Sequence, residues 1–290
     1  EFLFKKNKVD LIFGCAKINK NKEIVIDNNG DDIKNLFATN IIIATGAGPK
    51  KFKNSENFEK LDLWNYFDAM TPIKIPKSLG IIGSGAIGIE FASFYNAFNS
   101  DVTVVEIQDR ILPSEDTDVS DLAAKIFKKN GIKIFTNSKV EIIKKNKPNI
   151  MVEIISNLKK TNESFDKIIL AVGIQGNIES IGLDSVPQIK VSKGHVVVNE
   201  FCQTAQEGVY AIGDLVGPPW LAHKASHEGM MVAELLAGHT PTPFRSEDIA
   251  GCTYCHPQIA SVGFTEEKAK KEGIDVKIGR FPFLGNGKAL

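Results

Sequence analysis

The residues best suited to chemistry form a G-x-G-x-x-G sequence at positions 83–88. An apolar run at residues 79–82 leads into it. Glycines at this spacing allow a tight turn, let the backbone approach a pyrophosphate, and let a helix pack closely on a strand. The N-terminus of the following helix adds free N–H groups and a positive dipole end, which favour phosphates. The pattern predicts a dinucleotide-binding loop, the alternative being a glycine-rich turn that only joins two core elements. The apolar residues that predict the helix are Ile87, Phe91, Phe94, Tyr95 and Phe98.

An acidic residue, Glu106, ends the next apolar run, at residues 101–105. In a strand–helix–strand unit, a carboxylate about 20 residues after the glycines accepts hydrogen bonds from the adenosine ribose 2′-OH. The same carboxylate would repel a 2′-phosphate. The spacing therefore predicts NAD rather than NADP as the cofactor at this loop.

A second glycine turn follows the apolar run at residues 41–43, where the sequence reads Ala-Thr-Gly-Ala-Gly-Pro. A strand that ends in this way lets the backbone pass close to a flavin nucleotide, where a side chain would clash. The alternative interpretation is a plain strand-to-loop glycine turn.

A carboxylate, Asp214, ends a third strand-like run, at residues 209–212. Ligands bind at the carboxyl ends of strands in open α/β sheets, so this position suits a cofactor contact. A helix is predicted from about residue 220 to 236, and its positive N-terminal end would point at the group that Asp214 contacts.

The composition of the 290 residues narrows the class of protein further. Lys+Arg and Asp+Glu balance at 35 each, so net charge gives no reason to expect a nucleic acid partner. No apolar run approaches the ~20 residues that span a bilayer, and the first residues lack a signal-peptide core. Four cysteines are too few for a disulfide scaffold, which favours a reducing compartment. The absent initiator Met and the abrupt end indicate a fragment.

The elements around these residues alternate as in an α/β protein. Strand-like runs are predicted at residues 11–18, 22–26, 36–38, 132–135, 140–143, 150–155, 167–172 and 276–283. The first three predict an antiparallel meander. Helices are predicted at residues 116–130 and 266–272. The change of pattern after residue 248 predicts the opening of a further α+β domain.

Several longer motifs occur in one order along the chain: ATGAGP, IGSGAIGIE, VTVVE, TAQEGVYAIGD, PPWLAHKASHEG, HPQIASVGFTEEKAK and GRFPFLGNGKA. In these the sequence resembles the FAD-dependent pyridine nucleotide–disulfide oxidoreductases over essentially its whole length. The resemblance implies an α/β fold in which an NAD-binding Rossmann-like domain is inserted in an FAD-binding one, followed by the start of an α+β interface domain. The implied limits are 1–70 and 191–246 for the FAD domain, 71–190 for the NAD domain and 247–290 for the interface domain.

The resemblance also implies an activity. The chain is most similar to the members that oxidise protein-bound dihydrolipoamide and reduce NAD, with electrons passing through a redox disulfide and FAD. Such enzymes work with the lipoyl domains and core of a 2-oxo acid dehydrogenase complex, here with pyruvate favoured. They are homodimers when full length, in the bacterial cytoplasm or the mitochondrial matrix.

Three other functions stay open at this point. The first is another FAD/NAD(P) disulfide reductase, of the glutathione or mercuric reductase kind, although Glu106 disfavours NADP. The second is a soluble transhydrogenase. The third is a non-catalytic module that binds a nucleotide or docks in a complex.

Site residues follow from matching positions in the motifs. The implied FAD contacts are Ala16, Thr45, Gly46, Ala47, Asp214, Trp220, Leu221, Ala222 and His223. The implied NAD contacts are Gly83, Ser84, Gly85, Ala86, Ile87, Gly88, Ile89, Glu90, Glu106, Val140 and Gly173, with Glu90 on the nicotinamide side.

Two departures from the family pattern limit these assignments. Many members have Arg-x-Pro-Asn after the residue that matches Gly173, whereas this chain has Ile174, Gln175, Gly176 and Asn177. The redox pair C-x-x-x-x-C and the C-terminal His-Pro with its Glu do not occur among these residues. No catalytic residue is therefore assigned within the chain.

The remaining cysteines and histidines do not predict a metal site. Cys252 and Cys255 form a C-x-x-C, but no second pair completes four zinc ligands, and the motif lies in a strand-like run. His223 and His227 are four residues apart but lack the intervening Glu and a third ligand. Cys15 and Cys202 lie in strand-like runs and are predicted to be core residues.

Overall fold

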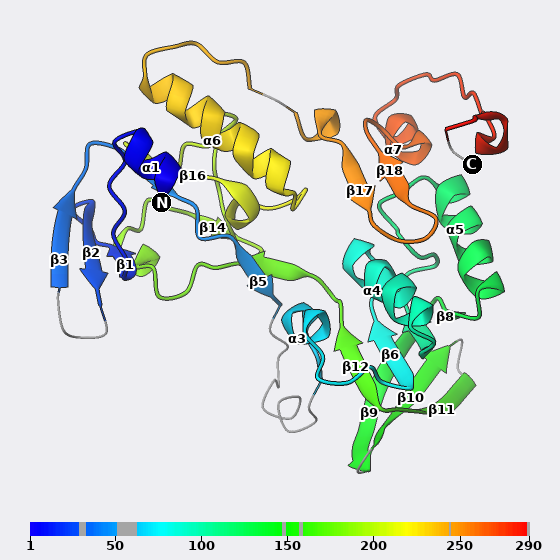
Figure 1. Ribbon diagram of the computed structural model, residues 1–290. Coiled ribbons are helices and arrows are strands. Elements are labelled where there is room, and N and C mark those ends of the chain that lie inside the picture. The colour runs from blue at the N-terminus through cyan, green and yellow to red at the C-terminus, as the bar shows by residue number, and fades with distance from the viewer. Residues whose placement is uncertain (29–32, 51–62, 147–148, 157–158, 244, 289–290) are drawn as a thin grey trace. The chain divides into compact units, whose positions relative to one another are not determined.

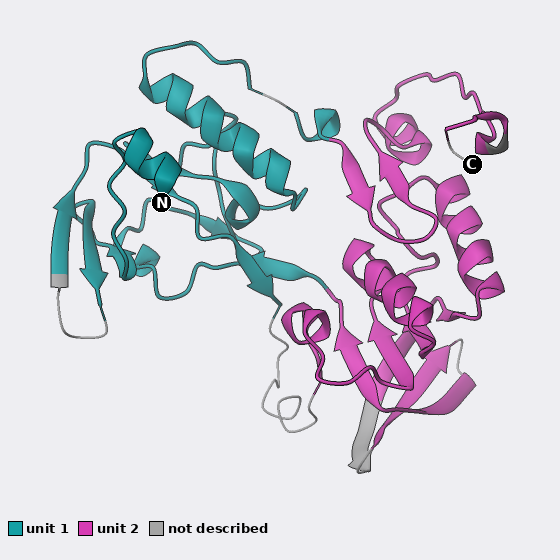
Figure 2. Ribbon diagram, viewed as in Figure 1, with its two compact units in different colours: residues 1–52, 173–249 teal, residues 53–172, 250–290 magenta. Residues whose placement is uncertain are grey.

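The computed structural model describes residues 1–28, 33–50, 63–146, 149–156, 159–243 and 245–288. The chain forms two compact units, coloured separately in Figure 2. Unit 1 comprises residues 1–52 and 173–249, and unit 2 comprises residues 53–172 and 250–290. In the described ranges, every helix is too short or too polar to cross a bilayer.

Unit 2 is built on a parallel sheet with the strand order β12-β6-β7-β8 (Figure 1). Its strands are β6 (Ser78–Ile82), β7 (Asp101–Val105), β8 (Lys133–Phe135) and β12 (Lys167–Leu170). The connecting helices are α4 (Ala86–Ala97) and α5 (Thr117–Lys129). The strand–loop–helix–strand unit predicted from the glycines is therefore confirmed. Its order places β6, which carries the glycine loop, in the interior of the sheet.

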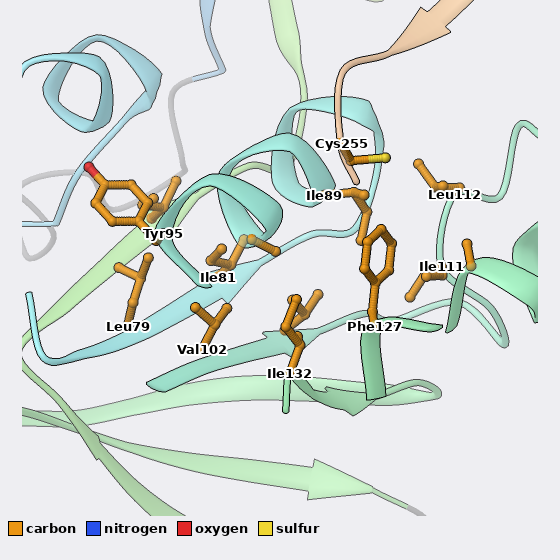
Figure 3. Packing of buried hydrophobic residues seen from close by; sticks show 14 of the residues in the cluster. Leu79, Ile81, Ile89, Tyr95, Val102, Ile111, Leu112, Phe127, Ile132 and Cys255 are labelled. Carbon is orange, nitrogen blue, oxygen red and sulfur yellow. The ribbon is translucent and has the colours of Figure 1, made fainter. Parts of the chain in front are cut away.

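Alternate residues of these strands face two different hydrophobic clusters, as the two-residue period of a strand requires. Leu79, Ile81 and Val104 pack with α4 and α5, and Figure 3 shows this cluster from close by. Val105 and Ile168 pack on the other face, against a second sheet. That sheet has the antiparallel order β11-β10-β9. Its strands are β9 (Ser138–Asn146), β10 (Asn149–Ser156) and β11 (Lys159–Phe165). The sequence predicted strands at 140–143 and 150–155 here and missed the third strand.

The buried face of α4 differs from the predicted apolar stripe. The helix buries Ile89, Ala92 and Tyr95, whereas Phe94 and Phe98 are 46% and 54% exposed. The Tyr95 hydroxyl donates a hydrogen bond of 2.6 Å to the carbonyl of Ala69, on the short helix α3 (Tyr66–Met70). The buried face includes the small residues Gly88 and Ala92, which allow close helix–strand packing.

Residues 250–288 pack within unit 2. Their elements are β17 (Gly251–Thr253), β18 (Ile259–Ser261), α7 (Glu266–Lys271) and η4 (Phe283–Gly285). Cys255 and Ile259 join the same buried cluster as Ile89 of α4, and Cys255 is labelled in Figure 3. The helix predicted at 266–272 is confirmed. The strand predicted at 276–283 is wrong, because these residues make no strand pairing within the described part of the chain.

Unit 1 contains three small sheets that concern the site. β1 (Cys15–Ile18), β2 (Glu23–Asp27) and β3 (Ile33–Phe37) form the predicted antiparallel meander. β4 (Ile41–Ile43) pairs in parallel with β16 (Val209–Ala211). β5 (Ala47–Pro49) pairs with β13 (Ile174–Gly176) as an antiparallel ribbon.

The remaining elements of unit 1 surround these sheets. They are α1 (Phe2–Lys6), η1 (Leu183–Ser185), β14 (Val191–Ser192), β15 (His195–Val196), η2 (Gly213–Val216), α6 (Ala222–Leu236) and η3 (Ser246–Asp248). The helix predicted at 220–236 is confirmed as α6. Residues 173–190 group with unit 1, whereas the sequence places them in the NAD-binding domain. The four predicted domain limits stay predictions.

Candidate functional site

Each glycine of the loop at 83–88 occupies a position with a different spatial requirement. Gly83 has φ +100°, and a Cβ there would collide with the carbonyl of Ala171. A Cβ at Gly88 would collide with the carbonyl of Gly83, so the first turn of α4 lies directly against the loop. Gly85 is the N-cap residue of α4, and a Cβ there would meet no atom within 4 Å. Gly83 and Gly88 are thus required by the fold, and Gly85 is not.

The surroundings of Gly85 fit a pyrophosphate. No side chain caps α4, so the amides of Ala86 and Ile87 have no side-chain acceptor from the N-cap residue. A Cβ at position 85 would project into open space, so the loop leaves room beside the start of α4. Helix N-termini of this kind bind anions through their N–H groups and dipole.

Glu106 is buried at the edge of this loop, with 6% of its surface exposed. Its Oε2 accepts hydrogen bonds from the amide of Ser84 at 2.8 Å and from the hydroxyl of Ser84 at 2.7 Å. Its Oε1 accepts one from the amide of Gln108 at 2.9 Å. A carboxylate offers about four acceptor positions, so one position on Oε1 is left for a ligand hydroxyl. The sequence did not reveal that Glu106 also holds the loop.

Glu90 lies in the second turn of α4 and contacts the segment after β17. Its Oε1 accepts a hydrogen bond of 2.8 Å from the amide of Tyr254. Three residues further along the same helix, the hydroxyl of Ser93 accepts a hydrogen bond of 2.9 Å from the amide of His256. The side chain of Ile89 is instead buried in the core. Glu90 is therefore placed to interact with a ligand only through its second oxygen.

The flavin-type loop in unit 1 is held by Asn177. Its amide nitrogen donates to the carbonyl of Thr45 at 2.9 Å, and its backbone N–H donates to the carbonyl of Gly46 at 2.9 Å. The Thr45 hydroxyl donates in return to the carbonyl of Asn177 at 2.9 Å. Gly46 has φ +68° and open space at its Cβ position, so this turn also leaves its backbone accessible. The sequence did not predict a role for Asn177, although this residue occupies the position of the Asn in the Arg-x-Pro-Asn pattern described above.

Asp214 lies in the turn η2, directly after β16. The carbonyl of Asp214 accepts a hydrogen bond from Nδ1 of His195 at 3.2 Å, and the ring of His195 lies 5.8 Å from that of Trp220. In the described part of the chain the Asp214 carboxylate has no hydrogen-bond partner. It is half-buried and can therefore accept hydrogen bonds from the hydroxyls of a ligand.

The N-terminus of α6 follows this turn. Leu221 is its N-cap residue and provides no side-chain cap, and Ala222 and His223 are exposed. The helix therefore begins two residues after Trp220, and its positive N-terminal end lies at Ala222 and His223. Ala16 lies apart from them on β1, where it pairs with Ile26.

The predicted FAD contacts and the predicted NAD contacts lie in different units, with one exception. All predicted FAD contacts lie in unit 1. The predicted NAD contacts lie in unit 2, with Val140 on β9, except Gly173, which belongs to unit 1. The individual contacts stay predictions.

Two of the four cysteines, Cys202 and Cys255, are buried. Burial raises the pKa of the Cys255 thiol to about 11, and the nearby Glu90 carboxylate adds to this rise. Burial likewise raises the pKa of Cys202 to about 12. Cys202 is buried as predicted, whereas the prediction for Cys15 is wrong, because β1 buries only Ile18. Among the described residues, no three His, Cys, Asp or Glu side chains are grouped as metal ligands would be.

Comparison with known proteins gives matches along both units. A family model described as pyridine nucleotide-disulphide oxidoreductase matches residues 1–229. The model of the dimerisation domain of that family matches residues 249–290.

Two curated relatives are similar along nearly the whole chain. A dihydrolipoyl dehydrogenase of Rhizobium etli is 45% identical over 305 aligned residues, covering 100% of this chain and 63% of the relative. A dihydrolipoyl dehydrogenase of Zymomonas mobilis is also 45% identical, covering 99% of this chain and 62% of the relative. The chain thus spans somewhat less than two thirds of the length of these relatives.

A solved structure shows the same arrangement of elements at lower identity. The HOCl-induced flavoprotein disulfide reductase of Escherichia coli has a TM-score of 0.82 to this chain at 26% identity. The match covers 99% of this chain and 66% of that protein.

Proposed function

Because the chain belongs to the pyridine nucleotide–disulphide oxidoreductase family, we propose that it is part of a dihydrolipoyl dehydrogenase that binds FAD and NAD. The observation that carries this proposal is the 45% identity, along the whole chain, to relatives with that name. Identity to the E. coli disulfide reductase is only 26%, which makes that activity the second candidate.

The residues of unit 2 would hold NAD. The amides at the start of α4 bind the pyrophosphate in front of Gly85, and Glu106 accepts a hydrogen bond from the adenosine ribose through Oε1. A 2′-phosphate would lie against this carboxylate, so NADP is disfavoured. Glu90 lies on the nicotinamide side of the loop.

The residues of unit 1 would hold FAD. The backbone of Thr45 and Gly46 would lie next to the nucleotide, and the Asp214 carboxylate would accept hydrogen bonds from the ribityl hydroxyls. The positive N-terminal end of α6, from Trp220 to His223, stabilises negative charge on the isoalloxazine ring. When bound, FAD supplies the two-electron chemistry that joins a dithiol to a nicotinamide.

The redox disulfide and the catalytic base are not supplied by residues 1–290. The four cysteines are not spaced as C-x-x-x-x-C, and Cys202 and Cys255 are buried with raised pKa values. In this proposal those groups belong to the rest of the protein. The partners are the lipoyl domains and core of a 2-oxo acid dehydrogenase complex, and residues 249–290 contribute to a homodimer.

The proposal is tested with the protein expressed from its complete gene. We expect a yellow protein with a flavin spectrum that reduces NAD⁺ in the presence of dihydrolipoamide and is far less active with NADP⁺. A flavoprotein that oxidises NADH without using dihydrolipoamide would indicate a different disulfide reductase or a transhydrogenase. A colourless protein that binds NADH would indicate a nucleotide-binding module.

A further inference from the structure

Two charged side chains of α6, Lys224 and Glu228, are almost completely buried in unit 1. They are 5% and 4% exposed. Their charged groups form an ion pair, with 2.9 Å between Nζ of Lys224 and Oε1 of Glu228. Removing two charges from water is costly, and an apolar pair of similar volume is often as stable or more stable. The pair therefore needs an explanation beyond the stability of the helix.

The pair binds the turn that carries Asp214. Oε2 of Glu228 accepts a hydrogen bond of 2.6 Å from the amide of Gly213. Nζ of Lys224 donates to the carbonyl of Gly213 at 3.3 Å and to the carbonyl of Gly217 at 3.2 Å. An ammonium has three donors, and these three acceptors use all of them. The two side chains thus bind the turn on both sides of Asp214.

The backbone of this turn contains two glycines in an unusual conformation and a long closing hydrogen bond. Gly213 and Gly217 have φ values of +74° and +106°, in the region that residues other than glycine rarely adopt. The hydrogen bond that closes the turn, from the amide of Gly217 to the carbonyl of Asp214, is 3.3 Å long. Such a turn depends on contacts with the rest of unit 1. Burial of Leu215, which is 0% exposed, anchors its middle, and Lys224, Glu228 and His195 provide hydrogen bonds to its backbone.

We propose that Lys224 and Glu228 are positioning residues for the Asp214 carboxylate, and that flavin affinity depends on this ion pair. The proposal rests on the proposed function, because it takes Asp214 as a flavin contact. Neither side chain touches the flavin. They act by holding Gly213 and Gly217, so that the carboxylate between them is oriented before the ribityl hydroxyls arrive.

The experiment compares variants of the full-length protein. Glu228→Gln leaves one acceptor oxygen where Glu228 uses two, so either the Lys224 ammonium or the Gly213 amide faces the NH2 group. Lys224→Met removes the donors to both glycine carbonyls. We expect each to raise the Kd for FAD by about tenfold or more, because ordering the turn then costs part of the binding free energy. Apoprotein is titrated with FAD while flavin fluorescence is followed. Glu234→Gln, an exposed glutamate of the same helix, is the matched control and should leave the Kd unchanged.

Two more variants separate positioning from stability. In Lys224→Met/Glu228→Met no buried charge is left, so a merely structural role predicts recovery of both the urea midpoint and the FAD affinity. Positioning predicts that the midpoint recovers while the FAD affinity stays low. Lys224→Arg keeps the charge and the donors, and should recover part of the affinity lost in Lys224→Met.

The outcomes distinguish this proposal from the proposed function. A wild-type protein that binds no flavin would contradict the proposed function itself. A wild-type protein that binds FAD, together with folded variants whose Kd stays within about twofold of it, would contradict only the role of the pair. If none of the variants folds as apoprotein, the pair is needed for the fold as a whole, and the positioning role is likewise overturned.

Discussion

The carboxylate of Glu106 binds both hydrogen-bond donors of Ser84, the amide at 2.8 Å and the hydroxyl at 2.7 Å. Ser84 lies between the first two glycines of the loop. The residue proposed to bind the ribose of NAD therefore also holds the loop proposed to bind the phosphates. Binding and loop stability are linked through a single side chain.

This link gives the first prediction. Ser84→Ala removes one hydrogen bond to Glu106 and should lower the free energy of unfolding by about 1 kcal/mol. Glu106→Ala removes three hydrogen bonds and the ribose acceptor, and should raise the Kd for NADH by about tenfold or more. Urea denaturation and NADH fluorescence titration measure the two effects. An unchanged Kd in Glu106→Ala would show that this carboxylate does not bind the ribose.

Substitution by alanine at two glycines of the loop should affect two different properties, the stability of unit 2 and the affinity for NADH. Gly88→Ala places a methyl group on the carbonyl of Gly83 and should destabilise unit 2 by about 3 kcal/mol or more. Gly85→Ala meets no atom within 4 Å at φ −66°, so the protein should stay folded and lose NADH affinity. Thermal unfolding and NADH titration on both variants make the comparison. A folded Gly85→Ala variant with wild-type NADH affinity would contradict the proposed phosphate site.

The third prediction concerns Asn177 and the flavin. Asn177→Ala removes the side-chain hydrogen bond to the carbonyl of Thr45 and should lower the free energy of unfolding by about 1 kcal/mol. It should also weaken FAD binding, because the turn at Thr45 and Gly46 becomes less well held. Asn162→Ala, on an exposed position of β11, is the control. Equal FAD affinity in the two variants would rule out this role for Asn177.

The buried thiols give a prediction for alkaline pH. Burial raises the pKa of Cys255 from 9.0 to about 11, and that of Cys202 from 9.0 to about 12. The folded state thus holds these protons more tightly than the unfolded state. The stability that they contribute is complete below pH 9 and is lost as pH rises through the folded-state pKa values.

We therefore expect the free energy of unfolding to fall between pH 9 and pH 11, and to fall less in Cys202→Ala/Cys255→Ala. Urea denaturation across this pH range is the measurement. Both thiols should also react slowly with a disulfide reagent at pH 8 until the protein unfolds. Rapid modification of Cys255 in the folded protein would contradict its burial.

Local patterns in the sequence predicted the elements that position the site. The glycine loop, the strand before it and the strand ending at Glu106 are set by neighbouring residues, so they could be identified without tertiary information. The overall fold is confirmed as mixed α/β, with FAD- and NAD-type domains and part of a dimerisation domain.

The features that the sequence did not predict correctly depend on contacts between residues far apart in the chain. Helix α4 is apolar on most sides, and periodicity could not show that the sheet takes Ile89 and Ala92 rather than Phe94 and Phe98. Lys224 and Glu228 stand four residues apart, a spacing typical of a solvated surface pair. Only the fold shows that this face of α6 is buried against the turn at Asp214.

The ribbon of β5 and β13 has a consequence for how the chain could have been assembled. Lys50, just after β5, donates its amide to the carbonyl of Gly173, just before β13, at 3.1 Å. The whole stretch between them therefore leaves and re-enters unit 1 at a single point, like an insertion at the tip of a hairpin. A segment with adjoining ends can be exchanged or transplanted without breaking its host, since the host needs only a short turn to close the gap. The glycine loop at Gly83 lies in this inserted stretch, whose core is completed from outside the insertion by Cys255 and Ile259.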